Sequence, residues 1–347
     1  MSGLQTGETT GATILDVAAL AKVSIRTVSR VINRSKFVNA ETRSRVEAAV
    51  EELGFRPSLR ARGLATGRSY LIGLVHDERN ALVLHSVQRG IAAEASRRGC
   101  ELVVHPVPAG QEPSVDDVLA FLARSHVDGI VIPPTLSGLR GLAEALAEVK
   151  AHVVAMSSAH IDGYEAMVLS NEREAVGQAA RYLIELGHRQ LALIAGPAGF
   201  HSTRERRAGF VDAVQGAGAE LVGEVAGDYG FESGVAGASR LLDSLPRPTA
   251  IFASNDIMAA GVLKAAAARN IAVPGELSVV GFDGSPLADM VIPALTTLQR
   301  PMESMAQDAA RCLLDMIEGV PTPMRMHATV TLRVGESTGP SPALPRP

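Results

Sequence analysis

From residue 13 to residue 57 the hydrophobic residues recur every three or four positions, which is the spacing of amphipathic helices. Polar caps divide this stretch into three short helices that begin after Thr13, Ser24 and Asn39. Gly54 and Pro57 end the third helix. The positions expected to face a common core are Val17, Ala18, Ala21, Val28, Val31, Ile32, Val46, Ala49, Val50 and Leu53. The pattern therefore predicts a compact module of three helices.

From residue 69 onward short apolar runs alternate with amphipathic stretches. The runs predict strands at 70–75, 101–107, 129–134, 152–156, 166–170, 190–196, 250–254 and 277–282. The stretches between them predict helices at 84–98, 139–149, 172–186, 204–216, 234–244 and 258–269. Such alternation is typical of parallel sheets covered by helices on both faces. The predicted fold class is an all-α head followed by an α/β core of two subdomains with parallel sheets, with a ligand cleft between the subdomains.

Composition narrows the class of protein. Of the 347 residues, 46% are hydrophobic and 20% are charged, which is typical of a globular chain. No apolar run approaches the ~20 residues that span a bilayer, and the first residues do not resemble a signal peptide, so we expect a cytoplasmic protein with no membrane partner. Cys100 and Cys312 lie far apart without ligands nearby, so we expect no disulfide, no metal site and no cofactor.

The net charge of −4 conceals an asymmetry between the two ends of the chain. Residues 1–68 contain 11 Lys and Arg and 6 Asp and Glu, which leaves 22 and 31 for the remainder. The head is therefore basic and the body acidic. A basic surface suits a polyanion and an acidic one repels it, so we expect contact with nucleic acid to be confined to the first sixty or seventy residues.

The second predicted helix carries Arg26 and Arg30 one turn apart on its polar face. Two helices joined by a short turn form the helix-turn-helix unit, whose second helix enters the DNA major groove. Arg is the favoured partner of guanine there. Polar side chains beside the arginines suit phosphate oxygens; they are Ser24, Thr27, Ser29 and Asn33. The alternative is that both arginines are ordinary solvated surface charges.

The stretch "TILDVAALAKVSIRTVSRVIN" and the residues that follow it resemble the amino-terminal part of LacI/GalR-family transcriptional repressors. The resemblance implies a helix-turn-helix domain at 13–57 in which Ile25, Arg26 and Arg30 read bases. Thr13 and Lys22 are assigned to the DNA backbone. Lys22 stands where the family usually has a turn glycine, a departure that offers a further phosphate contact.

Residues 58–68, "SLRARGLATGR", are too short to form a stable helix alone. In the similar repressors this segment becomes a hinge helix when two subunits pair on DNA. The resemblance implies that Leu64 wedges into the minor groove, with Arg60 and Arg62 on the DNA backbone. The alternative is a simple linker.

The motifs "YLIELGHRQLALIAG" and "STRERRAGF" extend the resemblance to the periplasmic-binding-protein-like core of the same family, at 69–335. The implied amino-terminal subdomain is about 69–168 and 298–327, and the carboxy-terminal subdomain about 170–296 and 329–335, with crossings near 169, 297 and 328. The implied effector-binding residues are Arg206, Tyr229, Asn255 and Asp283, and Asn80 is expected to line the amino-terminal side of the cleft and to bind the effector from there. Residues 336–347, rich in Pro, Gly and Ser, are predicted to be disordered.

Some of these side chains have simpler explanations. Asn255 or Asp256 can be the N-cap of the helix that follows, and Asp283 can be a turn former before a glycine. Arg204 and Arg207 compete with Arg206 for the inward position, and only the match to the R-x-x-G-F motif selects Arg206.

We therefore expect a non-enzymatic, effector-responsive repressor that binds a pseudo-palindromic double-stranded operator as a homodimer, or as a tetramer. The expected effector is a small polar molecule, a sugar or a sugar derivative, with a nucleoside as the alternative because the chain is poor in aromatic residues. A transport-type solute receptor would use the same core but not the basic head. A nucleotide-dependent enzyme is disfavoured because the chain has no G-x-G-x-x-G after the first strand and no P-loop.

Overall fold

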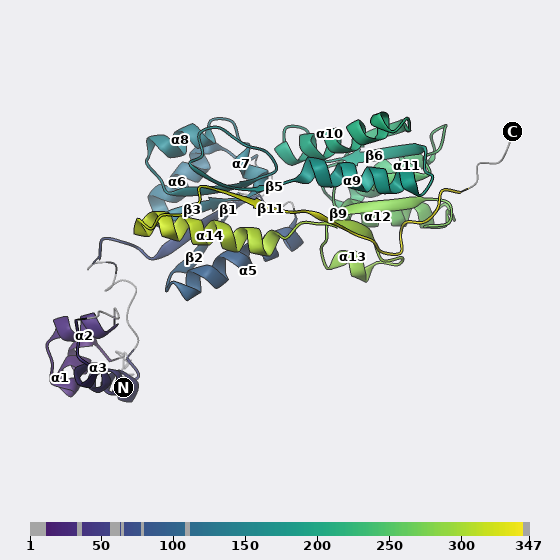
Figure 1. Ribbon diagram of the computed structural model, residues 1–347. Coiled ribbons are helices and arrows are strands. Elements are labelled where there is room, and N and C mark those ends of the chain that lie inside the picture. Colours follow the sequence, from purple (N-terminus) through teal and green to yellow (C-terminus); the bar gives the residue numbers. More distant parts are fainter. Residues whose placement is uncertain are drawn as a thin grey trace, which may run out of the picture. The chain divides into compact units, whose positions relative to one another are not determined.

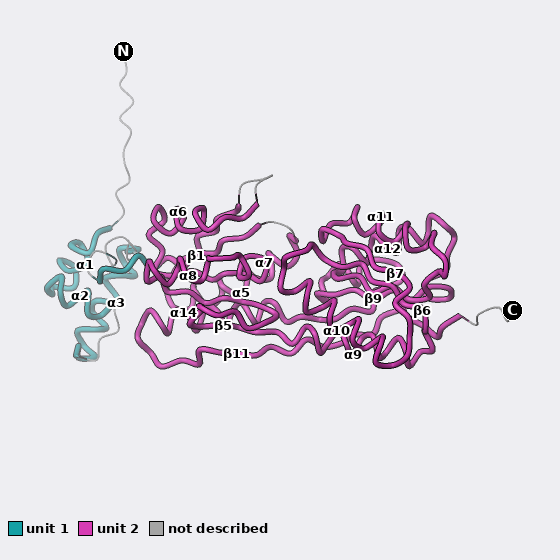
Figure 2. Tube along the Cα trace, turned by 90° about the horizontal axis from the view of Figure 1, so that it is seen from above, with its two compact units in different colours: residues 1–70 teal, residues 71–347 magenta. Residues whose placement is uncertain are grey.

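The computed structural model describes residues 12–32, 37–55, 63, 66–77, 80–107 and 112–342. The chain divides into two compact units, residues 1–70 and residues 71–347, shown in two colours in Figure 2. Each unit is described by itself below; we call them the head and the core.

The head contains α1 (Ile14–Ala21), α2 (Ile25–Ile32) and α3 (Ala40–Glu52). All three predicted caps are present. Thr13 Oγ1 accepts from Asp16 N at 3.4 Å, Ser24 Oγ accepts from Thr27 N at 3.1 Å, and Asn39 Oδ1 accepts from Thr42 N at 2.8 Å. The predicted core positions of these helices meet in one cluster, in which Val17, Val28 and Val46 are fully buried.

Lys22 ends α1 in the left-handed conformation, with φ 50° and ψ 48°. A residue with a Cβ atom is strained there, whereas glycine is not. This explains why a glycine at this turn is usual, and it means that the lysine costs the head some stability, on the order of 1 kcal/mol.

The core contains two six-stranded sheets (Figure 1). The first has the strand order β11-β5-β4-β3-β1-β2, and all of its pairs are parallel. Its strands are β1 (Leu71–His76), β2 (Glu101–Pro106), β3 (Gly129–Ile132), β4 (Val153–Ser157), β5 (Ala166–Ser170) and β11 (Arg325–Ala328). The helices of this amino-terminal subdomain are α5 (Ala81–Arg97), α6 (Val115–Ser125), α7 (Pro134–Ser137), α8 (Leu142–Glu148) and α14 (Met302–Glu318).

The second sheet has the order β12-β10-β9-β8-β6-β7, and only the edge pair β10 and β12 is antiparallel. Its strands are β6 (Gln190–Ala195), β7 (Glu220–Ala226), β8 (Ala250–Ala253), β9 (Ser278–Asp283), β10 (Thr296–Gln299) and β12 (Thr331–Arg333). The helices of this carboxy-terminal subdomain are α9 (Glu172–Glu185), α10 (His201–Gly216), α11 (Phe231–Leu242), α12 (Asp256–Ala267) and α13 (Leu287–Met290).

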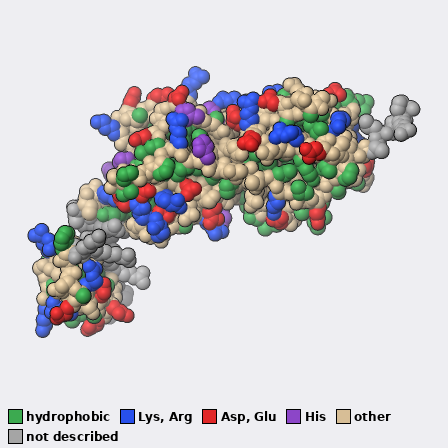
Figure 3. Space-filling view, in the orientation of Figure 1, with side chains coloured by type: hydrophobic (Ala, Val, Ile, Leu, Met, Phe, Trp, Pro, Cys, Tyr) green, Lys and Arg blue, Asp and Glu red, His purple; other side chains and the backbone are tan. Residues whose placement is uncertain are grey.

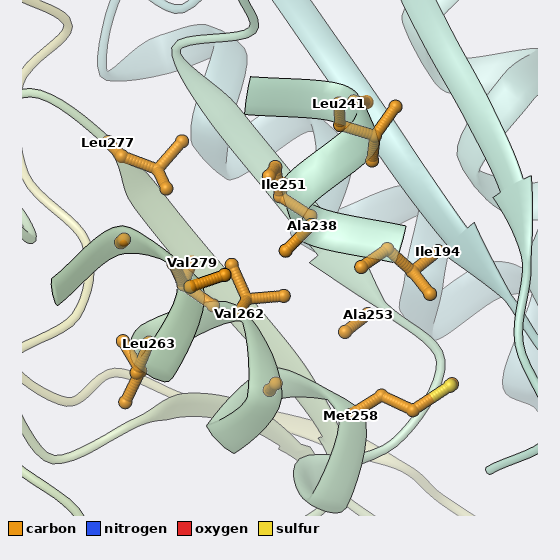
Figure 4. Close-up of a cluster of buried hydrophobic side chains, with 14 of the residues drawn as sticks. Ile194, Ala238, Leu241, Ile251, Ala253, Met258, Val262, Leu263, Leu277 and Val279 are labelled. Atoms are coloured by element: carbon orange, nitrogen blue, oxygen red, sulfur yellow. The ribbon is translucent and has the colours of Figure 1, made fainter. Parts of the chain in front are cut away.

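The two faces of the second sheet belong to two separate cores, because side chains alternate along a strand. Ile194, Ile251 and Val279 point to the face that α11 and α12 cover (Figure 4). Leu193, Phe252 and Val280 point to the opposite face, where α9 and α10 supply the partners. A Cβ at Gly234 would meet the Met258 backbone, so this glycine allows α11 to approach α12 closely.

The sequence pattern predicts most, but not all, of the described strands and helices. All eight predicted strands are present, while β7, β10, β11 and β12 were not predicted. The helices α6, α7, α13 and α14 were not predicted either. β7 and β11 each carry charged residues and lie at the edges of their sheets, so they lack the continuous apolar run of a central strand.

The chain crosses between the subdomains three times, after β5, after β10 and between β11 and β12. The predicted crossings near 169 and 297 fall just inside β5 and β10, which end at Ser170 and Gln299. The first and third crossings are joined by a hydrogen bond, in which Asn171 Oδ1 accepts from Val330 N at 2.8 Å.

The prediction that residues 336–347 are disordered is wrong for 336–342. Ser337 is fully buried, its backbone oxygen accepts from Val279 N at 2.8 Å, and its Oγ accepts from Thr296 N at 2.8 Å. Gly339 O lies 3.1 Å from Nε2 of the buried His188. The small polar residues that suggested disorder instead supply partners to the first residues of β9 and β10 in the second sheet. Residues 343–347 lie outside the described part of the chain.

Within the described residues no helix is both long and apolar enough to cross a membrane. On the face of the core seen in Figure 3, Lys and Arg side chains are interspersed with Asp and Glu side chains.

Candidate functional site

The second helix of the head exposes the three side chains predicted to read bases. Ile25, Arg26 and Arg30 are exposed, while Val28 and Val31 on the other side of α2 are buried. This orientation follows from the helical period, which places the valines toward α1 and α3. The base-reading role itself stays a prediction.

Four of the predicted backbone contacts lie on or beside α2. Lys22 and Ser24 are exposed, and Thr27 and Ser29 are half-buried. The Ser24 hydroxyl lies 2.9 Å from the Thr27 hydroxyl while it caps the helix, so both hydroxyls have a structural role already. Thr13, also predicted to contact the DNA backbone, lies in the capping box of α1. Asn33, Arg60, Arg62 and Leu64 lie outside the described residues.

The core has a cleft between its two subdomains, at the carboxyl ends of β1, β3, β8 and β9. It is lined by His76, Asp77, Asn80, Val83, Leu84, Val87, Pro133, Pro134, Thr135, Phe200, Ser202, Arg206, Tyr229, Asn255, Asp283 and Arg300. All five predicted effector-binding residues are in this set. The free volume is about 70 Å³, whereas small-molecule sites usually have ~300–1,000 Å³. A ligand the size of a sugar therefore requires the cleft to widen.

Asp283 stands at the centre of the cleft and is bonded to both subdomains. Its Oδ2 accepts from Asn80 Nδ2 at 3.1 Å, across the cleft, and its Oδ1 accepts from Arg300 Nη2 at 2.9 Å. Asn80 Oδ1 meanwhile caps α5 by accepting from Leu82 N and Val83 N. Burial raises the pKa of Asp283, although the arginines Arg300 and Arg206 oppose the rise. Asp283 thus links the two subdomains across the cleft through Asn80.

Arg206 is the buried arginine of α10, with 3% of its side chain exposed, so the competition with Arg204 and Arg207 is resolved in its favour. Its Nε donates to Glu172 Oε2 at 2.6 Å, and its Nη1 donates to Ser254 O. Glu172 Oε1 also accepts from Arg300 Nη1 at 3.0 Å. Burial alone would raise the pKa of Glu172, but Arg206 and Arg300 outweigh it and hold the pKa below its usual value.

Asn255 and Tyr229 support one another. Asn255 Oδ1 caps α12 by accepting from Met258 N at 2.8 Å, and its Nδ2 donates to Tyr229 O at 2.9 Å. Burial raises the pKa of Tyr229, whose hydroxyl lies 3.0 Å from Thr203 Oγ1. The simpler explanation of Asn255 as a cap is therefore correct, and its role in effector binding stays a prediction.

Asp256 is buried behind the cleft and is not among its lining residues. Its Oδ2 accepts from the Ser285 backbone N at 2.7 Å and from Ser285 Oγ at 2.8 Å, and its Oδ1 accepts from Thr297 Oγ1 at 2.5 Å. These contacts fix the turn that follows Asp283. Burial, followed by the neighbouring Asp283 carboxylate, raises the pKa of Asp256 to about 7.

Because of Asp256 we expect the core to gain stability as the pH falls from 8 to 6. The carboxyl titrates near 3.9 in an unfolded chain, so the folded state binds the proton more tightly. The resulting stabilisation is complete below about pH 4 and is lost as the pH rises through about 7. The difference between pH 8 and pH 6 is about 1 kcal/mol.

The measurement is urea unfolding of the wild type and of Asp256→Asn at both pH values. The stability difference between the two proteins is expected to change with pH. Asp289→Asn, which removes an exposed carboxylate paired with Arg333, is the control. An equal pH dependence of stability in the wild type and in Asp256→Asn would contradict the raised pKa of Asp256.

Sequence reasoning missed Glu172 and Arg300. Glu172 opens α9 directly after the first crossing, where an acidic residue is expected for the helix dipole alone. Arg300 follows β10 and carries no motif. Among the described residues no group of three His, Cys, Asp or Glu side chains is placed to hold a metal ion.

Comparison with known proteins agrees with this architecture. Residues 13–58 match the model of the bacterial regulatory proteins of the lacI family, and residues 180–338 match the periplasmic binding protein-like domain. The HTH-type transcriptional repressor PurR of Escherichia coli strain E24377A is 33% identical over 336 residues, covering 95% of this chain and 98% of the relative. The chain belongs to the lacI family.

Solved structures of lacI-family regulators share the fold. The Lac repressor dimer bound to operator and the anti-inducer ONPF has a TM-score of 0.80 at 28% identity, covering 94% of this chain and 99% of that chain. The transcriptional regulator CelR in complex with cellobiose has a TM-score of 0.70 at 33% identity, also over 94% of this chain and 99% of that chain. The predicted fold class, a helical head and a two-subdomain α/β core, is confirmed.

Proposed function

We propose that this lacI-family protein is a transcriptional repressor that binds a double-stranded, pseudo-palindromic operator as a homodimer and responds to a small polar effector. The observation that carries the proposal is α2, a helix with buried valines on one side and exposed Ile25, Arg26 and Arg30 on the other. The relatives support it, since the Lac repressor structure is a dimer on its operator.

The closed cleft supports a response to ligand. Its free volume of 70 Å³ is too small for a sugar. A sugar-sized effector therefore either binds only when the cleft is open, in competition with the closed form, or widens the cleft as it binds. Any such movement acts on the crossings, because Glu172 follows the first crossing and Arg300 the second. An effector that favours one arrangement shifts the population toward it, and DNA affinity shifts reciprocally.

We propose binding rather than catalysis in the cleft, because its carboxylates are held by arginines and amide donors. A repressor of this kind acts in the cytoplasm, where the operator is. The effector we propose is a sugar or a sugar derivative, with a nucleoside as the alternative; CelR, a relative of known structure, binds cellobiose. Among the cleft residues Tyr229 and Phe200 supply aromatic rings for such a ligand.

The test is selection of duplexes from a random pool by the full-length protein, followed by binding of the selected sequence with and without compounds. A thermal-shift screen of neutral sugars, polyols and nucleosides chooses the compounds. We expect a two-fold symmetric site and at least one compound that changes its affinity. No enrichment over random competitor at modest ionic strength would refute the proposal.

Arg26→Ala and Lys22→Ala are expected to weaken DNA binding in different ways. Loss of Arg26 removes a base contact, which costs about 1–3 kcal/mol and relaxes the preference at one operator position. Loss of Lys22 removes a phosphate contact, which weakens all sequences alike and lowers the salt slope by about one. Both residues are exposed, so neither change disturbs the core of the head.

Titrations of the selected operator and of a scrambled duplex at several salt concentrations separate the two roles. Lys22→Ala keeps the left-handed turn as strained as it is now, which makes the pair comparable. Equal effects of the two substitutions on both duplexes would contradict the assigned roles.

A further inference from the structure

Four charged side chains form one buried network between the cleft and the crossings. Glu172 binds Arg206 and Arg300, and Arg300 also binds Asp283. Each of the four side chains is at most 6% exposed. The net charge of the two arginines and the two carboxylates is zero, so neither arginine has an uncompensated charge to offer a ligand.

The hydrogen bonds that Arg206 and Arg300 donate also indicate that neither arginine is available to an anion. Arg206 lines the cleft but donates to Glu172 and to the carbonyl oxygen of Ser254. Arg300 has one nitrogen on each carboxylate, and its Nε is buried with no hydrogen-bond partner among the described residues. The arginines thus provide N–H groups for neutral oxygens but no net positive charge for an anion.

Besides Tyr229, the other ionisable residues that line the cleft are His76 and Asp77. Asp77 carries a carboxyl rather than a cationic group, so it offers an anion no attraction. A phosphorylated ligand would therefore enter a cleft in which, among the residues that the structure describes, both arginines are already paired with carboxylates.

We propose that Glu172 and Arg300 determine effector specificity by neutralising the cleft, so that the protein binds an uncharged polar ligand and rejects phosphorylated ones. The inference rests on the proposed function and specifies its effector class. Glu172 is the decisive residue, because among the described residues it is the carboxylate that forms ion pairs with both arginines, and it keeps Arg206 from acting as an anion-binding group.

The test uses inorganic phosphate as the probe and thermal melting of the full-length protein as the readout, with sodium chloride at equal ionic strength as reference. Glu172→Gln and Asp283→Asn each leave the network with one excess positive charge. We expect both to gain a saturable, phosphate-dependent rise in melting temperature, with phosphate binding about 10-fold or more tighter than in the wild type.

Glu224→Gln is the matched control. Glu224 pairs with Arg207, which follows Arg206 in α10, in an exposed ion pair outside the cleft. The Glu224→Gln substitution leaves Arg207 at the surface without its partner, and this variant is expected to respond to phosphate as the wild type does. Because all variants keep the same head, phosphate binding to the head cancels in the comparison. Glu172→Asp, which keeps the charge, is expected to behave like the wild type.

Equal phosphate responses of Glu172→Gln, Asp283→Asn and Glu224→Gln would overturn the proposal. If Glu172→Gln melts without a cooperative transition, phosphate is expected to restore one, and Asp283→Asn provides the independent measurement. Operator selection does not enter this experiment, so its failure would leave the proposed DNA-binding function untouched.

Discussion

Replacing Arg206 by Met is expected to lower the free energy of unfolding of the core by about 3–5 kcal/mol. The substitution leaves Glu172, which is fully buried, with Arg300 as its remaining cationic partner. A buried carboxylate that loses a partner keeps its desolvation cost without the compensating attraction. Met retains apolar contact with the Phe282 ring, over which the guanidinium carbon of Arg206 lies at 3.6 Å, so the lost charge dominates the effect.

The control is Arg207→Met, which removes an arginine from an exposed ion pair instead of a buried one. Arg207 makes a two-pronged ion pair with Glu224 at 2.6 and 2.8 Å, but 50% of its side chain is exposed. Such surface pairs contribute about 0–1 kcal/mol. Urea unfolding followed by far-ultraviolet circular dichroism compares the two variants. Similar losses from both would mean that the buried network contributes no more than a surface pair.

The head could be predicted almost entirely from the sequence because its determinants are local. The capping atoms of Thr13, Ser24 and Asn39 lie three residues from the N–H groups that they accept. The helical period then decides which valines are buried and leaves Arg26 and Arg30 exposed. What such patterns cannot supply is the DNA contact itself, which depends on a partner molecule.

The cleft could be predicted only in part because its energetics depend on contacts between distant residues. Glu172 and Arg300 are 128 residues apart and bind each other through a topology with three crossings. A charged residue in a sequence is expected at the surface, so nothing local marks these two as buried. The resemblance to a family identified Arg206 and Asp283, but their ion-pair partners in this chain became visible only in the fold.

The carboxy-terminal residues show another limit of prediction from the sequence. Pro, Gly and Ser indicated disorder at 336–347, because such composition rarely buries enough apolar surface to fold. Residues 336–342 are held instead by hydrogen bonds from Ser337 and Gly339 to the second sheet and to His188. Composition predicts the absence of a hydrophobic core, and it does not detect polar anchors of this kind.

Asp283→Gly is expected to abolish the effector response while the protein stays folded and binds its operator. Asp283 has φ 114°, in the left-handed half of the map that favours glycine. Glycine therefore removes the carboxylate and relieves the backbone strain together, whereas Asp283→Ala removes the carboxylate and keeps the strain. A charged hydrogen bond is worth about 1.5–3 kcal/mol, so two such bonds to a ligand correspond to a loss of effector affinity of at least about 100-fold.

Comparing glycine and alanine at position 283 separates the role in binding from the role in the turn. If the carboxylate binds the effector, neither variant responds to the compound selected by the thermal-shift screen, and Asp283→Gly melts at or above the temperature of Asp283→Ala. Asp289→Ala, an exposed carboxylate six residues on, is the control and is expected to respond normally. Should Asp283→Gly respond like the wild type while Asp283→Ala fails to fold, Asp283 would be a turn former, and the cleft would bind its effector through other groups.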